Sequence, residues 1–478
     1  MQEFPNYIDG EWCMSAVTRP NINPSDIRDV IGQAANADAA DLDRAVAAAR
    51  QAAPGWAAST PQQRFDVLDA IGSEILARKQ ELGTLLSREE GKTLVEGIGE
   101  VARAGQIFKF FAGEALRMSG EKLASVRPGV EVEIQREPLG VVGLITPWNF
   151  PIAIPAWKSA PALCFGNSVV LKGAEAVPGS SWALADIIAR SGLPKGVFNL
   201  VNGEGADVGA RLVAHPDVDA ISFTGSVVTG RQIAQVCAGQ MKKVQLEMGG
   251  KNPMVVLDDA DLDLAVDACI NGAFFSTGQR CTASSRLIVT EGIYPDFVER
   301  MVTALSQLKV GPALDPQTQI GPAIDQAQLE KDLHYLAVAQ QEGARLLCGG
   351  ERLSLEPAGF YLSPALLAET DNAMRINREE VFGPVATLIK VQDYEAALAA
   401  ANDTEFGLSA GICTRSLKYA SDFRRRVRAG MVMVNLPTAG VDYHVPFGGT
   451  KGSSYGSREQ GRYAAEFYSS VKTAYIQP

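Results

Sequence analysis

Cys281 lies in the segment STGQRCTASS, residues 276–285, where small polar residues follow the apolar run INGAFF. An isolated cysteine is usually a small buried hydrophobe. Its position in a glycine-containing turn without apolar neighbours raises a second possibility, a nucleophile. A nucleophilic cysteine needs a lowered pKa, and no histidine or CxxC partner lies near Cys281 in the sequence. The local sequence therefore leaves both interpretations open.

Two further residues carry groups that suit chemistry on a carbonyl compound. Glu247, in QLEMGGKNP, ends a predicted buried strand, where burial raises the pKa of a carboxyl group towards the range of a general base. Asn149, in PWNFP, has a proline two residues away on each side, and its amide could donate to a developing oxyanion. A surface glutamate beside a turn and a turn-forming asparagine are the alternative interpretations.

Two glycine-containing turns could bind the phosphates of a nucleotide. In VNGEGADVG, the spacing of Gly203, Gly205 and Gly209 is one residue too long for a dinucleotide fingerprint. In FTGSVVTG, a predicted strand leads to Gly225 and Ser226 at the start of a helix, whose free N–H groups and dipole attract anions. An ordinary strand-to-helix turn explains the second pattern equally well.

Lys172 and Glu175 follow the predicted strand SVVLKG and are three residues apart. Beside a bound nucleotide, such a pair could contact ribose hydroxyls or a phosphate. A lone lysine at a strand end is more often simply solvated.

The elements that must position these groups alternate between strands and helices. Residues 36–116 show helical periodicity, residues 121–138 alternate like a hairpin arm, and strand–helix units follow from residue 139. A second such series begins near Asp261 and ends at about residue 450. This alternation predicts an α/β fold with doubly wound parallel sheets, in which ligands bind beyond the carboxyl ends of the strands.

Composition excludes several classes of function. A chain of 478 residues is too long for a single hydrophobic core, so more than one domain is expected. The net charge of −11, with no basic block, argues against nucleic acid or an anionic membrane surface as a partner. No apolar run approaches the roughly 18 residues of a membrane span, and no leader pattern is present, so we expect a cytoplasmic protein. Seven scattered cysteines and three histidines favour neither a disulfide framework nor a metal site.

Seven segments together resemble the NAD(P)-dependent aldehyde dehydrogenase superfamily. They occur in the family's order and cover essentially the whole chain. The segments are PWNFP (147–151), LKGAE (171–175), FTGS (223–226), LEMGGKNP (246–253), GQRC (278–281), EEVFGP (379–384) and PFGGTKGSSYG (446–456).

The resemblance implies an aldehyde-dehydrogenase-like α/β fold with two doubly wound parallel-sheet domains and a small β arm. Residues 1–117 and 139–248 would form the NAD(P)-binding domain, and residues 249–455 the catalytic domain. Residues 118–138 and 456–478 would form an oligomerisation element, so we expect a homodimer or homotetramer.

The resemblance also implies the roles of individual residues. Cys281 matches the nucleophile, Glu247 the general base, and Asn149 the oxyanion donor that acts with the Cys281 backbone N–H. The implied reaction passes through a thiohemiacetal and a thioester, which water then hydrolyses to a carboxylate. The positions that match cofactor-binding residues are Ile145, Trp148, Lys172, Glu175, Gly203, Gly225, Ser226, Glu380 and Phe382.

Within the superfamily, PWNFPIAIPAWKSAPAL, STGQRCTASSR and the SREQG ending are similar to bacterial 2-oxoglutarate semialdehyde (2,5-dioxopentanoate) dehydrogenases. Such a substrate carries a carboxylate, so a cation is expected beside the tunnel. The sequence offers Arg117 and Arg280 for this role. Phe150, Trp157 and Phe447 are expected to form an apolar wall.

Two departures from the family pattern concern the cofactor and the late motif. Gly173 replaces a proline that many members have, and GSSYG stands where many have SGYG. The cofactor could be NAD or NADP, and the carboxylate of Glu175 favours NAD because it would repel a 2′-phosphate.

Other functions remain open at this point. A succinate semialdehyde dehydrogenase or a broad-range aldehyde dehydrogenase would share the same residues. A structural protein of the same fold without turnover is the alternative from a different class, although it would have no chemical need for Cys281, Glu247 and Asn149 together. A cysteine esterase would not need the paired cofactor features.

Overall fold

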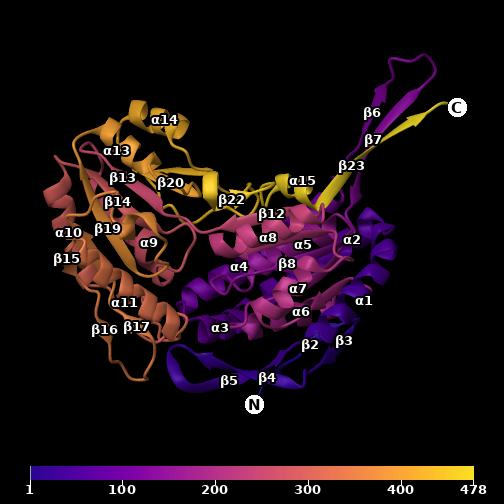
Figure 1. Ribbon diagram of the computed structural model, residues 1–478, viewed down its shortest axis with the longest axis horizontal. Helices are drawn as coiled ribbons and strands as arrows, with labels where there is room; N and C mark the ends of the chain where they lie inside the picture. The colour runs from indigo at the N-terminus through magenta and orange to yellow at the C-terminus, as the bar shows by residue number, and fades with distance from the viewer. Residues whose placement is uncertain (1) are drawn as a thin grey trace.

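The computed structural model describes residues 2–478. Figure 1 shows two α/β halves side by side, the first indigo to magenta and the second largely orange, with a slender arm projecting from one corner. Sheets of 8 and 7 strands form the centres of the two halves. This architecture confirms the predicted α/β fold with two largely parallel, doubly wound sheets.

The 8-stranded sheet has the order β22-β12-β11-β8-β9-β10-β2-β3. From β8 the chain adds β9 and β10 on one side and β11 and β12 on the other, and these five strands are parallel to one another. The flanking strands β2 and β22 pair with β10 and β12 in the antiparallel direction. The order reverses between β8 and β11, so a ligand crevice is expected outside their carboxyl ends. The strands are β2 (Asn6–Ile8), β3 (Glu11–Cys13), β8 (Val141–Ile145), β9 (Ser168–Lys172), β10 (Phe198–Leu200), β11 (Ala220–Gly225), β12 (Lys243–Met248) and β22 (Ser454–Tyr455).

Helices cover both faces of this sheet. Thr60 and Pro61 begin α2, because the Thr60 hydroxyl accepts a hydrogen bond from the Gln63 N–H and proline fits the first turn. The long helix α4 packs against α2 and α5. The helices are α1 (Ala39–Ala57), α2 (Pro61–Ala77), α3 (Lys79–Glu90), α4 (Leu94–Ala115), α5 (Ala153–Cys164), α6 (Pro178–Arg190), α7 (Ala210–Ala214), α8 (Val227–Gly239) and α15 (Ala465–Tyr468).

The 7-stranded sheet has the order β15-β18-β19-β14-β13-β20-β21, and its members are parallel except for the β15–β18 pair. Its strands are β13 (Asn252–Val256), β14 (Ser284–Thr290), β15 (Arg345–Cys348), β18 (Ala365–Ala368), β19 (Val385–Val391), β20 (Ser409–Cys413) and β21 (Met431–Val434). The helices are α9 (Leu262–Phe274), α10 (Tyr294–Ser306), α11 (Gln326–Gln341), α12 (Arg375–Arg378), α13 (Tyr394–Asn402) and α14 (Leu417–Arg426).

The projecting arm is a sheet of 3 strands in the order β23-β7-β6. It joins β6 (Glu121–Ala124) and β7 (Glu131–Pro138) to the chain's last strand, β23 (Ser469–Ile476), with antiparallel pairing. The hairpin predicted from alternation is therefore present, and the last strand of the chain pairs with it. Its role in oligomerisation and the domain boundaries stay predictions.

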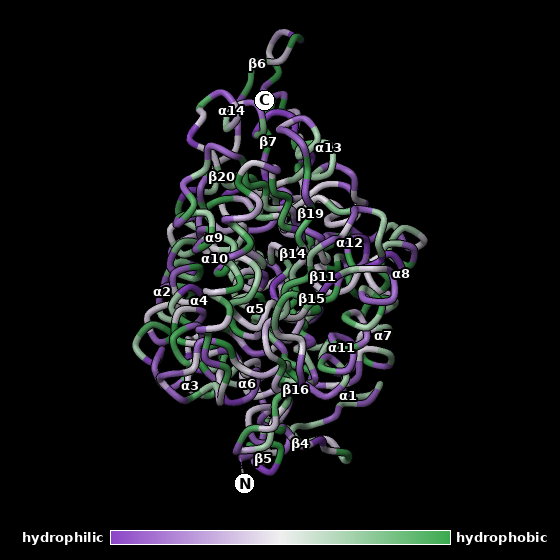
Figure 2. The backbone as a smooth tube through the Cα atoms, turned by 90° about the vertical axis from the view of Figure 1, so that its left-hand side faces the viewer, coloured by the Kyte–Doolittle hydropathy of each residue, from purple (hydrophilic) through white to green (hydrophobic). Residues whose placement is uncertain are grey.

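Smaller sheets complete the fold. One pairs β5 (Asp26–Asn36) with β1 (Gln2–Phe4) and β4 (Val17–Asn23), and another pairs β16 (Arg352–Leu353) with β17 (Tyr361–Leu362). Figure 2 shows hydrophobic residues, in green, along β11 and β14 in the interior. Within residues 2–478, no helix is both long and apolar enough to cross a membrane.

Candidate active site

Cys281 lines a cavity of about 520 Å³ between the two halves of the molecule. Residues of α4 and the turn before it form one wall, and the start of α5 forms a second. The chain on either side of Cys281 and the segment after β21 close the remaining sides. The lining residues are Lys92, Glu96, Gly99, Glu100, Arg103, Phe150, Ala153, Trp157, Asn271, Ser276, Arg280, Cys281, Thr282, Met433, Leu436, Pro437, Ala439, Gly440, Val441 and Phe447.

The turn that carries Cys281 has an unusual backbone. Helix α9 ends at Phe274, and Ser276, Thr277 and Gly278 then adopt left-handed φ angles of 52°, 56° and 65°. At Gly278 a Cβ atom would lie 2.1 Å from the Gly383 carbonyl oxygen, so only glycine fits there. This run of left-handed residues turns the chain from α9 towards β14 and leaves Cys281 facing the cavity.

Asn252 fixes the backbone after Cys281. Its Nδ2 donates to the carbonyl oxygens of Cys281 at 2.8 Å and Ala283 at 3.0 Å, and its Oδ1 accepts from the Ser409 N–H at 3.0 Å. Asn252 lies in the GGKNP segment that was noted for its glutamate, but its function could not be seen in the sequence. One amide thus ties the cysteine turn to two strands of the second sheet.

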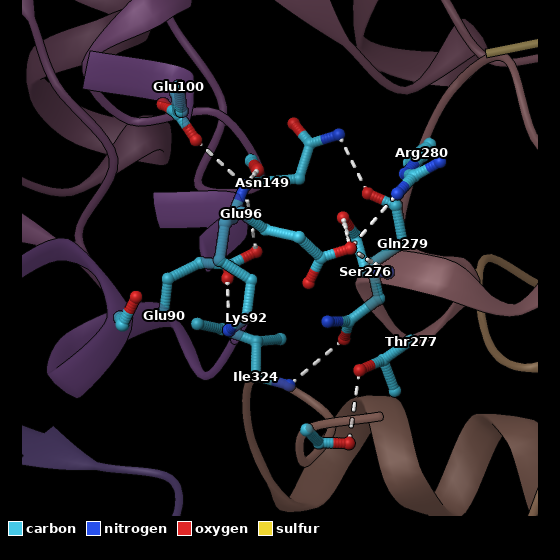
Figure 3. A network of polar contacts seen from close by, with 12 residues as sticks. Glu90, Lys92, Glu96, Glu100, Asn149, Ser276, Thr277, Gln279, Arg280 and Ile324 are labelled. Atoms are coloured by element: carbon cyan, nitrogen blue, oxygen red, sulfur yellow. Dashed lines mark hydrogen bonds and ion pairs between the residues drawn. The ribbon is translucent and has the colours of Figure 1, made fainter. Parts of the chain in front are cut away.

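Asn149 lies directly beside the same turn. Its Nδ2 donates to the Gln279 carbonyl oxygen at 2.9 Å, and its own carbonyl oxygen accepts from Lys92 Nζ at 2.6 Å (Figure 3). A side-chain amide has two N–H donors. One of them therefore remains available for a ligand oxygen near Cys281.

Two glutamates on α4 connect the loops that meet at the cavity (Figure 3). Glu96 accepts from the Ser276 N–H at 2.8 Å and from Arg280 Nη2 at 3.0 Å. Glu100 accepts from Lys92 Nζ at 2.7 Å and from the N–H groups of Ile152 and Ala153 at 3.0 and 3.1 Å. Their spacing of four residues, which places them on one face of the helix, was the available signal in the sequence.

Glu247 lies at the carboxyl end of β12 and is 2% exposed. Its Oε2 accepts a hydrogen bond from Ser454 Oγ at 2.5 Å, and Ser454 is the residue at which the late motif departs from the family pattern. Burial, and secondarily the carboxylate of Glu459, raise the pKa of Glu247 well above its ordinary value. The expectation of a raised pKa is thus met by the geometry. Glu459 itself is paired with the buried Lys158.

Burial also raises the pKa of the Cys281 thiol to about 12, and the carboxylates of Glu380 and Glu247 add to the effect. Without a ligand the sulfur is therefore protonated at neutral pH. A nucleophilic role requires a proton acceptor or a nearby positive charge.

The predicted ribose-contacting residues meet at the carboxyl ends of β8 and β9. Ile145 is the register partner of Lys172 there. Glu175 Oε1 accepts from Lys172 Nζ at 3.0 Å and from the Gly205 N–H at 2.5 Å, while Arg19 lies 3.5 Å from Oε2. Lys172 thus offsets the charge of Glu175, while Arg19 is shared between Glu175 and Glu204. The carboxylate of Glu175 is therefore a weaker argument for NAD than the sequence indicated.

The two glycine-containing turns lie at the edges of this crevice. A Cβ atom on Gly225 would lie 2.5 Å from the ring of Phe223, and one on Gly203 would lie 2.5 Å from Val208. Ser226 begins α8 by accepting from the Thr229 N–H at 3.3 Å. Packing against these side chains therefore requires glycine at both positions. The free N–H groups at the N-terminus of α8 are the donors that a pyrophosphate would use.

The crevice is closed from the second half by Glu380 and Phe382. Glu380 accepts from the Gly250 N–H at 2.9 Å, and a Cβ atom on Gly249 would lie 2.2 Å from its carboxylate. Phe382 has a φ angle of 69°, and its ring meets that of Trp148 edge-on at 5.5 Å. The crevice thus supplies a helix N-terminus for phosphates, polar groups for a ribose and an aromatic wall, which together fit a nicotinamide dinucleotide.

The structure places four of the five predicted substrate-binding residues in the cavity and one outside it. Phe150, Trp157 and Phe447 line the cavity, and the rings of Trp157 and Phe447 are 5.4 Å apart. Arg280 also lines it, although its charge is paired with Glu96.

Arg117 lies outside the cavity and lines a separate surface pocket, where it pairs with Glu114. The expectation that it lies beside the tunnel is therefore wrong. Arg117 follows the end of α4 and comes 14 residues after Arg103. This separation corresponds to about 20 Å along a helix axis. Arg103, which the sequence did not single out, is the arginine of this helix that lines the cavity. Among residues 2–478, no cluster of His, Cys, Asp and Glu side chains could hold a metal ion.

Comparisons with known proteins agree with this geometry. The model of the aldehyde dehydrogenase family matches residues 12–474. The chain is 43% identical to the alpha-ketoglutaric semialdehyde dehydrogenase of Bacillus subtilis (strain 168), over 99% of this chain and 98% of that protein. It is 42% identical to the alpha-ketoglutarate semialdehyde dehydrogenase of Haloferax volcanii, over 98% of each. The structure of betaine aldehyde dehydrogenase from Staphylococcus aureus in complex with NAD+ superposes with a TM-score of 0.97, at 35% identity and with 99% and 95% of the two chains covered. The chain belongs to the aldehyde dehydrogenase family.

Proposed function

We propose that this aldehyde dehydrogenase oxidises 2-oxoglutarate semialdehyde (2,5-dioxopentanoate) to 2-oxoglutarate, with NAD or NADP as the hydride acceptor. The observation that carries the proposal is that Cys281, the basic side chain of Arg103 and the aromatic rings of Phe150, Trp157 and Phe447 line one cavity. A substrate with an aldehyde at one end and a carboxylate at the other suits such a cavity. Both relatives described above are named for this semialdehyde.

Cys281 is the proposed nucleophile. Because its pKa is raised to about 12, the thiol must lose its proton before the sulfur attacks the aldehyde carbon. That proton passes to solvent, and the positive charge of a nicotinamide bound nearby would favour the thiolate. The free N–H of the Asn149 amide and the Cys281 backbone N–H then stabilise the oxyanion of the thiohemiacetal.

The bound nicotinamide supplies the oxidising power by accepting a hydride. The residues that would hold the dinucleotide are Ile145, Trp148, Lys172, Glu175, Gly203, Gly225, Ser226, Glu380 and Phe382. Loss of the hydride leaves a thioester on Cys281. Glu247 then removes a proton from water, which attacks the thioester and releases the carboxylate and the thiol.

A slight preference for NAD is part of the proposal. Glu175 would repel a 2′-phosphate, whereas Lys172 and Arg19 reduce that repulsion. We expect a kcat/KM for NAD that exceeds the value for NADP by less than about tenfold. Titration calorimetry with each dinucleotide measures the same preference independently of turnover.

A panel of substrates tests the proposed function. Formation of reduced cofactor would be followed with 2-oxoglutarate semialdehyde, succinate semialdehyde and pentanal, and we expect kcat/KM to be highest for the first by about tenfold or more. A higher value for succinate semialdehyde would identify a succinate semialdehyde dehydrogenase. Similar values for all three would identify a broad-range enzyme, and no reduced cofactor with any aldehyde would favour a catalytically silent protein.

We also propose that residues 118–138 and 456–478 mediate assembly into a homodimer or homotetramer. The support is that Leu123, Val471 and Tyr475 of the arm expose large apolar side chains, at 49%, 62% and 62%. Residues 1–117 with 139–248, and residues 249–455, are the proposed cofactor and catalytic domains, and the proposed location is the cytoplasm. Light scattering on the full chain and on Val471→Asp would measure the assembly, and an unchanged mass would contradict the role of the arm.

A further inference from the structure

Three cationic side chains line the cavity beside Cys281, and two of them already have anionic partners. Lys92 Nζ lies 2.7 Å from Glu100 and also donates to the Asn149 carbonyl oxygen at 2.6 Å. Arg280 Nη2 lies 3.0 Å from Glu96. Neither charge is therefore free to bind an anionic ligand without giving up a buried partner.

Arg103 is different, because no carboxylate of the described residues lies within ion-pair distance of it. Within residues 2–478, its one hydrogen bond runs from Nη2 to Gln460 Oε1 at 3.3 Å, and its buried Nε has no acceptor. The guanidinium lies over the ring of Trp157 at 5.8 Å. Burial lowers the pKa of Arg103, and the more distant charges of Glu100 and Asp442 oppose this shift.

Two neighbours of Arg103 also hold donors without acceptors. The indole Nε1 of Trp157 and the amide Nε2 of Gln460 are buried and have no hydrogen-bond partner among residues 2–478. Buried donors in folded proteins are nearly always satisfied. Three unsatisfied donors in one corner therefore indicate that a ligand supplies the missing acceptor oxygens.

We infer that Arg103 binds the carboxylate of the substrate and that the Trp157 N–H donates to the same 2-oxo acid group, while Gln460 positions the guanidinium. The inference rests on the proposed function and names the residues that would give its specificity. An α-oxo carboxylate presents three acceptor oxygens on adjacent carbons, and a guanidinium binds such a planar group through two parallel hydrogen bonds.

The position of Arg103 on α4 agrees with this assignment. Glu96, Glu100 and Arg103 are spaced by four and three residues, so they share one helix face. Glu96 holds the turn of Cys281, and Arg103 lies about 10 Å farther along the helix axis. A substrate bound to Arg103 is therefore held away from the cysteine turn at one end, with its aldehyde end free to approach Cys281.

The test compares an acidic and a neutral aldehyde in Arg103→Gln, Arg103→Lys and Trp157→Phe. For Arg103→Gln we expect kcat/KM for 2-oxoglutarate semialdehyde to fall about 100-fold, against less than about threefold for pentanal. Arg103→Lys keeps the charge and should recover part of the loss. Trp157→Phe keeps the ring and should lose about tenfold on the acidic substrate alone.

Binding gives a second readout that does not depend on turnover. 2-Oxopentanoate retains the 2-oxo acid group but has no aldehyde, so its dissociation constant by calorimetry should rise about 100-fold in Arg103→Gln. Arg117→Gln is the matched control, because this arginine lies outside the cavity, and it should leave both values unchanged.

The outcomes separate this inference from the proposed function. Equal losses on both aldehydes, or unchanged binding of 2-oxopentanoate in Arg103→Gln, would overturn the role of Arg103 while leaving the substrate assignment intact. A native enzyme that prefers succinate semialdehyde but loses that preference in Arg103→Gln would overturn the substrate and retain Arg103 as the carboxylate-binding residue.

Discussion

Carboxyl groups lie on two sides of Cys281, but they differ in how completely they are hydrogen-bonded. On the α4 side, Glu96 and Glu100 accept from backbone N–H groups and from Arg280 and Lys92. On the β12 side, Glu247 accepts from Ser454 and has a strongly raised pKa. Glu100 and Glu247 are both buried. The number of donors decides which carboxylate holds the structure and which can exchange a proton.

The same criterion separates the two arginines that line the cavity. Arg280 has a carboxylate partner and joins the scaffold, whereas Arg103 lacks one and can bind a ligand. An ionisable group that the protein leaves incompletely satisfied is therefore the better candidate for function. Four changes would break or sharpen this comparison.

Cys281→Ala should have the largest effect, because it removes the sulfur that attacks the substrate. We expect kcat to fall by more than about a thousandfold, while the dissociation constant for NAD by calorimetry changes less than about twofold. Turnover near the native rate would refute the nucleophile.

Glu247→Gln should separate the first half of the reaction from the second. Loss of the general base should lower steady-state kcat by about 100-fold or more, while one equivalent of reduced cofactor still forms rapidly in stopped flow. Unchanged steady-state turnover would remove Glu247 from the mechanism.

Glu100→Gln should affect stability more than chemistry. Without this carboxylate, the buried positive charge of Lys92 loses its nearest anionic partner. The free energy of unfolding should therefore fall by about 3 kcal/mol, and Tm should fall in calorimetry. Asp69→Asn breaks the more exposed pair with Lys109 and should cost less than about 1 kcal/mol. Equal changes in the two variants would contradict the contrast drawn here.

Ser454→Ala should produce the smallest effect, a shift in pH dependence. The hydroxyl stabilises the ionised form of Glu247, so its loss raises the pKa of that carboxyl further. The rise of kcat with pH should then move to higher pH by about half to one unit. Ser457→Ala, on the same segment, should leave the profile in place, and an unshifted profile in Ser454→Ala would exclude this role.

The cofactor crevice was largely predictable because strand ends and glycines are local features. Lys172, Gly225 and Ser226 each follow a recognisable strand, and parallel strands bring their carboxyl ends together. The sequence could therefore place them at one crevice before the fold was known. The charge balance around Glu175 was not predictable, because Arg19 reaches it from a strand far earlier in the chain.

The substrate cavity was predictable only in part, because side chains from remote segments form it. Phe150 and Trp157 follow a recognised motif and do line the cavity. Arg103 also lines the cavity but follows no recognised motif. Helical periodicity shows that residues share one face of a helix, but it does not show what that face contacts. The position of Arg117 was wrong for the same reason.

The short strand β22 has a consequence for how the site is completed. Although it follows the whole second half of the chain, it pairs with β12, where Ser454 and Glu247 are register partners. During synthesis on the ribosome, the first half can bury its helices long before Ser454 emerges. The hydroxyl that tunes Glu247 arrives only after the second half has been made, so a truncated chain lacks the finished environment of its base.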